Sequence, residues 1–344
     1  MGSAFPLVAL GRSPRTEWLP KDAVLHGAGR QAIRALLQHG RDVHGWRRVL
    51  IPSYSCPDVV RALRGVLPIV YYPCPPGNET APPEPRQDEV LLVTSLFGVQ
   101  PENLGQISGA NVVLDVTHDP TAPWLGDVDV GYIVASLRKT LPVPDGAATW
   151  SPRGLSLPKD PPPISRHIEA VAAGVRAMYL KSEYLDGADI EKSTFLRLFA
   201  SMEREFARSM PARISAFSRD LVGSFPVHEW RRQRLSNIDC LTTAVSAIRE
   251  LTVLPGTFGV VVRFESHDQR ERVRLWLLAA RIYPAILWPM DDMDAAPADR
   301  DFSQRMLFLH ADSRWGERDM HRVAEQVAVC LDQRGGTGVG QPDR

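Results

Sequence analysis

The stretch NVVLD (111–115) and the run VGYIVAS (130–136) that follows it decide the fold class of this chain. Both consist mainly of Val, Ile, Leu and Ala, and neither alternates between apolar and polar residues. Strands that are covered on both faces have this pattern. Three earlier runs are of the same kind: RVLIP (48–52), VLPIVYY (66–72) and EVLLVTS (89–95). We therefore expect buried strands at all of these positions.

Helical patterns lie before and between these runs. GRQAIRALLQHG (29–40) has its apolar residues at helical spacing and ends in Gly40. CPDVVRALRG (56–65) has a proline in its first turn and ends in a glycine. Strands that alternate with helices form a doubly wound, mainly parallel sheet. The sequence therefore predicts an α/β fold.

The later part of the chain has a different organisation. Residues 164–222 have a mostly helical pattern, and a long helix is expected soon after Gly223. The elements expected after it are FGVVVRF (258–264), a helix, the strands ILWP (286–289) and MLFLH (306–310), and a last helix. We therefore expect a large domain over 1–222 that includes the helical segment 164–222, a small α+β domain over 223–334, and a disordered Gly-rich tail over 335–344.

Composition excludes several classes of partner. The 344 residues include 40 basic and 40 acidic ones, so no net field attracts nucleic acid or an anionic membrane. No apolar run reaches the length of roughly 18 residues that a spanning helix needs, and the N-terminal apolar run lacks the basic segment of a secretory signal. The cysteines Cys56, Cys74, Cys240 and Cys330 form no CxxC pair, and no HxH or HExxH occurs. We therefore expect a cytoplasmic protein without a metal, a nucleic-acid partner or a membrane partner.

Polar residues follow four of the predicted strands. They are Ser53 to Cys56, Thr94 and Ser95, Asp115 with His118, and Ser136 with Lys139. Ligands of an open parallel sheet bind beyond the carboxyl ends of its strands. Convergence of these residues on one edge predicts a binding site there.

The lysine and the carboxylate of this set each have two interpretations. Lys139 is either a Schiff-base amine, which must lose its proton near other cations such as Arg138 and Arg30, or an exposed lysine after a strand. Asp115 either pairs with a protonated pyridine nitrogen or caps the following turn. Similarly, Gly29 either opens a phosphate-binding helix start or belongs to a plain tight turn.

The order of these motifs resembles that of the fold-type-I pyridoxal-phosphate enzymes, and among them the DegT-like sugar aminotransferases. The stretches that carry the resemblance are GAGRQAI (27–33), IPSYSCPDVV (51–60), TSLFGVQPENL (94–104), VVLDVTHD (112–119) and ASLRKTLPVPDGAAT (135–149). The small-domain runs also resemble those of this family. The resemblance implies the aspartate-aminotransferase-like fold, pyridoxal 5'-phosphate as cofactor, and a homodimer with shared active sites.

The resemblance also implies a role for each site residue. Lys139 would bind the cofactor covalently and move protons, and Asp115 would hold the pyridine nitrogen. The remaining cofactor-binding residues would be His118, Ser136, Gly29, the amides of Arg30 and Gln31, Ser95, Cys56, Tyr54 and, from the partner subunit, Asn237. Arg30 stands where the family usually has a threonine. Cys56 stands where an aromatic residue usually stacks on the ring, so that either Tyr54 or no residue would take over the stacking.

The resemblance implies a PLP-dependent aminotransferase, which moves an amino group from a donor such as glutamate or glutamine to a small keto acceptor such as a ketosugar. Arg314, Arg263 and Trp288 are the candidate substrate residues. Two other functions stay open. The chain is either a PLP-dependent lyase, decarboxylase or replacement enzyme, or a non-catalytic partner protein with the same fold.

Overall fold

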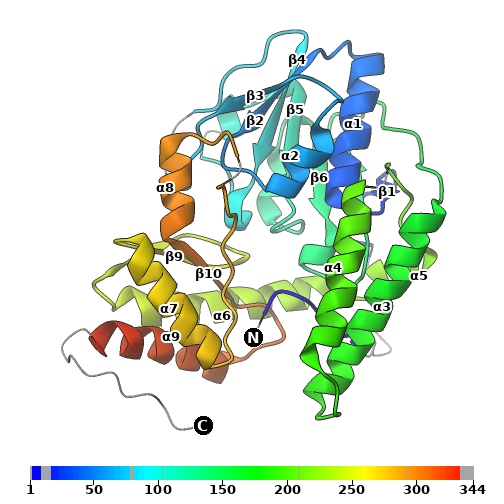
Figure 1. Cartoon of the computed structure of the whole chain (residues 1–344). Helices are drawn as coiled ribbons and strands as arrows, with labels where there is room; N and C mark the ends of the chain where they lie inside the picture. The colour runs from blue at the N-terminus through cyan, green and yellow to red at the C-terminus, as the bar shows by residue number, and fades with distance from the viewer. Residues whose placement is uncertain are drawn as a thin grey trace.

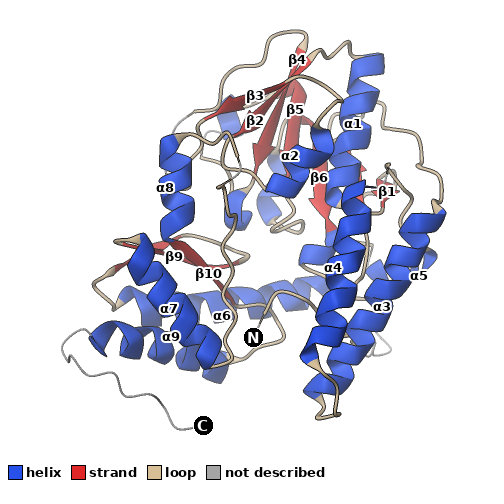
Figure 2. Ribbon diagram, viewed as in Figure 1, coloured by secondary structure: helices blue, strands red, loops and turns tan. Residues whose placement is uncertain are grey.

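The computed structural model describes residues 2–8, 17–77, 81–102, 104–208, 210–291 and 293–333. It contains two separate sheets with helices around them (Figures 1 and 2). The α-helices are, in chain order, α1 (Gly29–Val43), α2 (Pro57–Leu63), α3 (Ser165–Leu185), α4 (Lys192–Arg208), α5 (Ala216–Val222), α6 (Val227–Ser246), α7 (His267–Ala279), α8 (Pro297–Arg305) and α9 (Glu317–Asp332). No described helix is long and apolar enough to cross a membrane. The tail predicted over 335–344 lies outside the described residues.

The larger sheet has seven strands in the order β1-β7-β6-β5-β4-β2-β3. They are β1 (Val24–His26), β2 (Arg48–Pro52), β3 (Ile69–Tyr72), β4 (Glu89–Thr94), β5 (Gly109–Asp115), β6 (Val130–Ser136) and β7 (Ala147–Trp150). Neighbours from β6 to β3 are parallel, whereas β7 is antiparallel to both β6 and β1. The predicted mainly parallel α/β sheet is confirmed. The two short strands β1 and β7 were not predicted.

Both faces of this sheet are buried, which explains the unbroken apolar runs. Leu91 and Val93 of β4 belong to one core, and Val90 and Leu92 of the same strand belong to the core on the opposite face. Helices α1 and α2 cover the face that carries Val90 and Leu92. Helix α5 and the start of α6 pack on the face that carries Leu91 and Val93. Successive side chains of a strand point to opposite faces, so every position of a strand between two cores must be apolar.

The smaller sheet is antiparallel, in the order β10-β9-β8. Its strands are β8 (Leu251–Leu254), β9 (Gly259–Phe264) and β10 (Met306–His310). The expected strand ILWP (286–289) is wrong, because only its neighbour Ala285 forms an isolated bridge, to Phe308. Pro284 precedes this run and Pro289 ends it, and proline removes a ladder donor. Its apolar side chains instead pack in a cluster between the two sheets.

Helix α6 takes part in both cores. Val227 at its start packs under the large sheet, and Leu241 and Val245 pack in the core of the small sheet. The two parts are therefore joined by a packed helix. The placement of a domain boundary between residues 222 and 223 stays a prediction.

Helices α3 and α4 form an antiparallel hairpin that extends away from the large sheet (Figure 1). This hairpin and α5 make up the segment 164–222 that was expected to be helical. Met202 and Phe206 of α4 pack with Ala28, the residue before α1. The hairpin is therefore anchored beside the first turn of α1.

Candidate active site

A cavity of about 210 Å³ lies at the carboxyl ends of β4, β5 and β6. The strand register places Thr94 beside Asp115 and Asp115 beside Val134. The residues that follow these strands therefore share one edge of the sheet. The cavity brings together predicted cofactor residues from distant stretches: Gly29, Arg30, Cys56, Ser95, Asp115, His118, Ser136 and Lys139.

Lys139 lies in a short 3-10 turn, Leu137–Lys139, directly after β6. The strand is buried along its whole length, whereas Lys139 is exposed where it lines the cavity. Lys139 also lines a second cavity of about 330 Å³. Its amine is therefore placed between two spaces that could each hold a small molecule.

Asp115 is the last residue of β5, and its carboxylate lines the cavity. Burial raises the pKa of this carboxyl, and the hydrogen bonds of Thr117 and the charge of Lys139 act in the opposite direction. One carboxylate oxygen accepts a 2.9 Å hydrogen bond from the backbone N–H of Thr117. Asp115 therefore both caps the following turn and presents a carboxyl to the cavity, so the two interpretations of this residue are compatible.

His118 is a neutral ring in the cavity wall. Burial lowers its pKa to about 3, and Nδ1 accepts a 3.0 Å hydrogen bond from the backbone N–H of Phe97. The ring stacks on Phe258 at a centroid distance of 4.6 Å and lies nearly parallel to Trp288 at 5.8 Å. Since Nδ1 is an acceptor, the proton of the neutral ring is on Nε2.

The start of α1 is built for close approach to Ser136. A Cβ added to Gly29 would lie 2.9 Å from the Cβ of Ser136, which is too close for any residue but glycine. The N-cap residue Ala28 makes no side-chain cap, and no acidic residue occurs in the first turn. Uncapped N–H groups at a helix start, next to a serine hydroxyl, suit a phosphate group.

Gln31 does not take the place predicted for it. Its backbone N–H donates a 3.0 Å hydrogen bond to the carbonyl of Ala28, and its side-chain oxygen accepts from the backbone N–H of Ala212. The amide is thus already used within the first turn of α1. We therefore remove Gln31 from the candidate site.

Glu203 of α4 is a site residue that the sequence analysis missed. Its carboxylate accepts hydrogen bonds from Arg30 and, at 2.6 Å, from Arg138. Burial alone would raise the pKa of Glu203, but the guanidinium groups of Arg138 and Arg30 hold it at about 2. Arg30 also pairs with Asp58 at 3.3 Å. The end of the cavity next to the start of α1 therefore carries two arginines, which the carboxylates of α2 and α4 neutralise.

A sequence signal for Glu203 exists. Phe195, Phe199 and Glu203 recur at a spacing of four residues, so the carboxylate lies on the apolar stripe of α4. A charged residue on a buried stripe needs a partner, because an unpaired buried charge is costly. The pattern indicates a buried partner without identifying Arg30 or Arg138.

Trp288, and not Tyr54, is the aromatic residue in the cavity wall. Tyr54 is fully buried behind it, with the ring centroids 5.8 Å apart, and its O–H donates to the carbonyl of Leu287. The predicted stacking by Tyr54 is therefore wrong. Cys56 does line the cavity, and burial raises the pKa of its thiol. Ser95 lines it as well, and its hydroxyl donates to the carbonyl of Val99 at 2.7 Å.

Asn237 and Arg263 lie away from the linings of both cavities. The side-chain amide of Asn237 is buried and faces the carbonyls of Ala311, Asp312 and Trp315 at 2.9 to 3.2 Å. It has no free donor for a partner subunit, so we remove it from the candidate site. Arg263 pairs with Asp301 at 3.0 Å near the surface, and we remove it as well.

The second cavity contains the remaining substrate candidates. It shares its wall with the first through His118, Arg138, Lys139, Glu203 and Trp288. Arg314 lines it from the loop after β10 and pairs with Asp312 at 2.6 Å. A molecule in this cavity could therefore contact Lys139 and the wall that the two cavities share.

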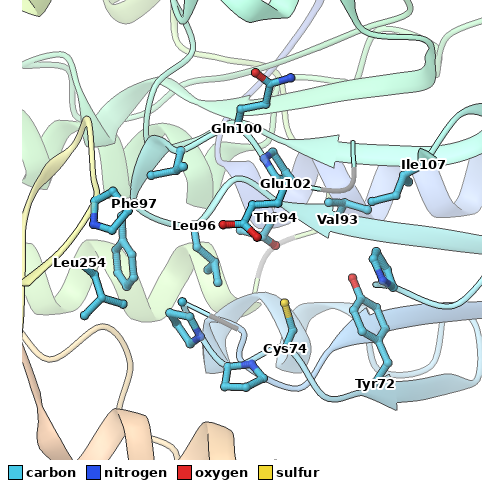
Figure 3. A pocket seen from close by; sticks show the side chains of 17 residues that line it. Tyr72, Cys74, Val93, Thr94, Leu96, Phe97, Gln100, Glu102, Ile107 and Leu254 are labelled. Carbon is cyan, nitrogen blue, oxygen red and sulfur yellow. The ribbon is translucent and has the colours of Figure 1, made fainter. Parts of the chain in front are cut away.

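A third cavity of about 150 Å³ lies between the ends of β3 and β4 and the strand β8 (Figure 3). Figure 3 shows Cys74, Thr94 and Leu254 around it. Burial raises the pKa of Cys74 to about 11, so this thiol stays protonated. No lysine, arginine or histidine is among the described residues of its lining. Its described lining therefore offers no cation for a phosphate-bearing cofactor.

Solved structures with the same architecture are sugar aminotransferases and related enzymes. DesI with its TDP-sugar product is 16% identical, with 91% of this chain and 81% of DesI covered and a TM-score of 0.57. Spr1654 from Streptococcus pneumoniae, a sugar aminotransferase in its PLP form, is 13% identical, with 90% and 87% covered and a TM-score of 0.58. 3-Amino-5-hydroxybenzoic acid synthase is 15% identical, with 90% and 86% covered and a TM-score of 0.56.

These similarities establish the fold of the chain, which is that of the PLP-dependent aminotransferases. The fold expected from the sequence is confirmed. No protein-family model and no curated protein matches the sequence.

Proposed function

We propose that the protein is a PLP-dependent aminotransferase, and that the first cavity is its cofactor site. The observation that carries the proposal is the convergence of Lys139, Asp115 and the uncapped start of α1 on one cavity. The amine, the carboxylate and the phosphate-binding turn come from three separate stretches of the chain. An arrangement with only a structural role has no need of all three.

The residues present fit pyridoxal phosphate. The glycine at position 29 lets the start of α1 come close to Ser136, and a phosphate accepts hydrogen bonds well at such a helix start. Arg30 and Arg138 lie beside this end of the cavity, where each pairs with Glu203. When bound, the cofactor supplies an electron sink for the substrate carbon.

The chain itself supplies binding and proton transfer. The carboxylate of Asp115 would attract a protonated ring nitrogen of the bound cofactor and keep the proton there. The amine of Lys139 would hold the cofactor covalently and, once released, would move a proton at the substrate α-carbon. Trp288 and the neutral ring of His118 form the aromatic wall of the site.

The proposed reaction moves an amino group from an amino acid donor, such as glutamate or glutamine, to a small keto acceptor. DesI was solved with a TDP-sugar product, so a ketosugar is one acceptor to test.

We further propose that the enzyme acts in the cytoplasm as a homodimer. The apolar side chains of Ile168, Tyr179 and Leu196, each about half exposed on the α3–α4 hairpin, support the homodimer. Light scattering would contradict it by giving the mass of one chain.

The cofactor chemistry is tested with the purified full chain and pyridoxal phosphate. We expect a yellow protein in which borohydride fixes the cofactor on Lys139, as peptide mass mapping would show. Lys139→Ala should prevent the attachment, whereas Lys159→Ala, at an exposed loop position, should leave it unchanged. A colourless protein, or a label on another lysine, would contradict the proposal.

Incubation with glutamate separates the remaining alternatives. An aminotransferase releases 2-oxoglutarate and leaves the amine on the cofactor. Release of ammonia or carbon dioxide would identify a lyase or decarboxylase instead. Absence of any spectral change with every common amino donor would favour the non-catalytic alternative.

A further inference from the structure

The second cavity is where a substrate would meet Lys139. It has a volume of about 330 Å³, and its wall includes Lys139 together with Trp288 and His118 from the first cavity. Its other walls come from the N-terminal residues Ser3 to Phe5, the α3–α4 hairpin and the small sheet. Figure 1 shows the N-terminal end of the chain in the space between the hairpin and the small sheet.

Apolar side chains make up most of this cavity. Phe199 and Met202 face it from α4, and Phe258 and Phe308 face it from the small domain. Trp288 separates it from the first cavity. Aromatic rings on several sides favour a ligand that is itself apolar and ring-shaped.

The chain already neutralises two of the three basic side chains in this lining. Arg314 is bound to Asp312 at 2.6 and 2.8 Å and also donates to the backbone carbonyls of Gly2 and Ala4 at 2.8 and 2.9 Å. Arg138 is bound to Glu203 at 2.6 Å. The third basic group is the amine of Lys139, which the proposed function reserves for the cofactor.

The histidines of the wall add no charge near pH 7. Burial lowers the pKa of His310 to about 4 and that of His118 to about 3. Nε2 of His310 is buried and has no hydrogen-bond partner among the described residues. Both rings are therefore neutral parts of the cavity wall near pH 7.

We propose that the second cavity binds an uncharged keto compound with an apolar ring, and not a phosphate-bearing sugar. The proposal rests on the proposed aminotransferase function and specifies its acceptor. A nucleotide sugar carries two phosphate charges, which need free cations or hydrogen-bond donors. In this cavity, phosphates would have to displace Asp312 or Glu203 from an arginine. An apolar ring would instead replace water beside Phe199 and Phe258 without breaking an ion pair.

Two ligands distinguish the two classes of acceptor. The full chain loaded with pyridoxal phosphate is titrated with phenylacetone and, separately, with thymidine diphosphate, and heat is recorded by calorimetry. We expect phenylacetone to bind at least about tenfold more tightly than thymidine diphosphate. Equal or tighter binding of the diphosphate overturns the proposal, and so does the absence of saturable phenylacetone binding.

A matched pair of variants on α4 locates the binding. Phe199→Ala removes an aromatic ring from the cavity wall and should lower the affinity for phenylacetone about tenfold. Arg197→Ala, at an exposed position of the same helix, should leave the affinity unchanged. If Phe199→Ala unfolds, Phe258→Leu tests the opposite wall. Equal affinity of the folded Phe199 or Phe258 variant and the wild type overturns the proposal.

Failure of this proposal is distinct from failure of the proposed function. Borohydride labelling of Lys139 is measured on the same preparation. If Lys139 is labelled and thymidine diphosphate binds tightly, only the proposed class of acceptor is rejected. Absence of labelling rejects the aminotransferase function itself.

Discussion

The carboxylate of Glu203 accepts a 2.6 Å hydrogen bond from Nη2 of Arg138, the residue next to Lys139. Through this contact, the α3–α4 hairpin supports the turn that carries the proposed reactive amine. The same carboxylate holds Arg30 at the start of α1. One side chain therefore holds two of the segments that form the first cavity.

Replacement of Glu203 should show a defined pH dependence. Its pKa is lowered from 4.5 to about 2 in the folded protein, so its stabilising effect is complete above about pH 4.5 and is lost as the pH falls toward 2. The side chain is 38% exposed, and solvent screening keeps the effect small. We expect Glu203→Gln to lower Tm by about 2 °C at pH 7 and by less at pH 3.

Glu169→Gln, at an exposed position of α3, is the control for this measurement. It should leave Tm unchanged at both pH values. A Tm difference for Glu203→Gln that grows as the pH falls would contradict the assigned ion pairs.

Substitution of Gly29 tests the phosphate-binding end of the cavity. Gly29→Ala places a Cβ 2.9 Å from that of Ser136, so α1 must move away from the serine. We expect the affinity for pyridoxal phosphate, measured by absorbance titration, to fall at least about tenfold. Gly126→Ala meets no atom within 4 Å and serves as the control. Equal affinities of the two variants would place the phosphate elsewhere.

Asp119 should be among the most sensitive positions for stability. It is fully buried and binds Arg231 and Arg234 of α6, each at 2.9 Å, and also accepts from the hydroxyl of Thr257 at 3.0 Å. Asp119→Ala leaves both guanidinium groups without their partner, and such a loss typically costs 3–5 kcal/mol. Urea unfolding should show that Asp119→Ala lowers the free energy of unfolding by about this amount. Asp127→Ala, at an exposed position, should have little effect on it. A loss below about 1 kcal/mol would contradict the importance of this network.

His26 should make the protein sensitive to mild acid. It is fully buried without a ring partner, and burial lowers its pKa from 6.5 to about 4. The unfolded chain therefore takes up a proton between these pH values that the folded chain does not, and stability falls as the pH drops from 6.5 to 4. For one histidine, the free energy of unfolding falls by about 1.4 kcal/mol per pH unit in this range.

His26→Phe keeps a ring at this position and should reduce the loss of unfolding free energy per pH unit. Urea unfolding at pH 7, 6 and 5 measures this loss. His228→Gln, at an exposed position of α6, should keep the wild-type slope. An unchanged slope for His26→Phe would mean that His26 is not responsible for the acid sensitivity.

The strands were predictable where both faces of the sheet are covered. The ranges 48–52 and 130–136 agree with β2 and β6, because a strand between two cores has an unbroken apolar run. β7 has only four residues, AATW, and no pattern distinguishes so short a segment from a loop. ILWP (286–289) shows the converse, since an apolar run also occurs where a loop packs between two sheets.

Site residues that directly follow strands were predictable, because the topology of a parallel sheet places strand ends together. Glu203 was not, since 173 residues separate it from Arg30 and a helical pattern identifies a buried face without its partner. Asn237 shows the limit of motif reasoning. Its side-chain amide donates hydrogen bonds to backbone carbonyls of the loop after β10, and no local sequence pattern reveals this.

The position of α6 in both cores limits how the molecule can move. A hinge of loose chain would let the small sheet swing independently, but here Val227 and Val245 are packed at opposite ends of one rigid rod. Any movement of the small sheet relative to the large sheet must therefore move this helix as well. A spectroscopic label near residue 227 would then report on events at the small sheet, almost twenty residues farther along the helix.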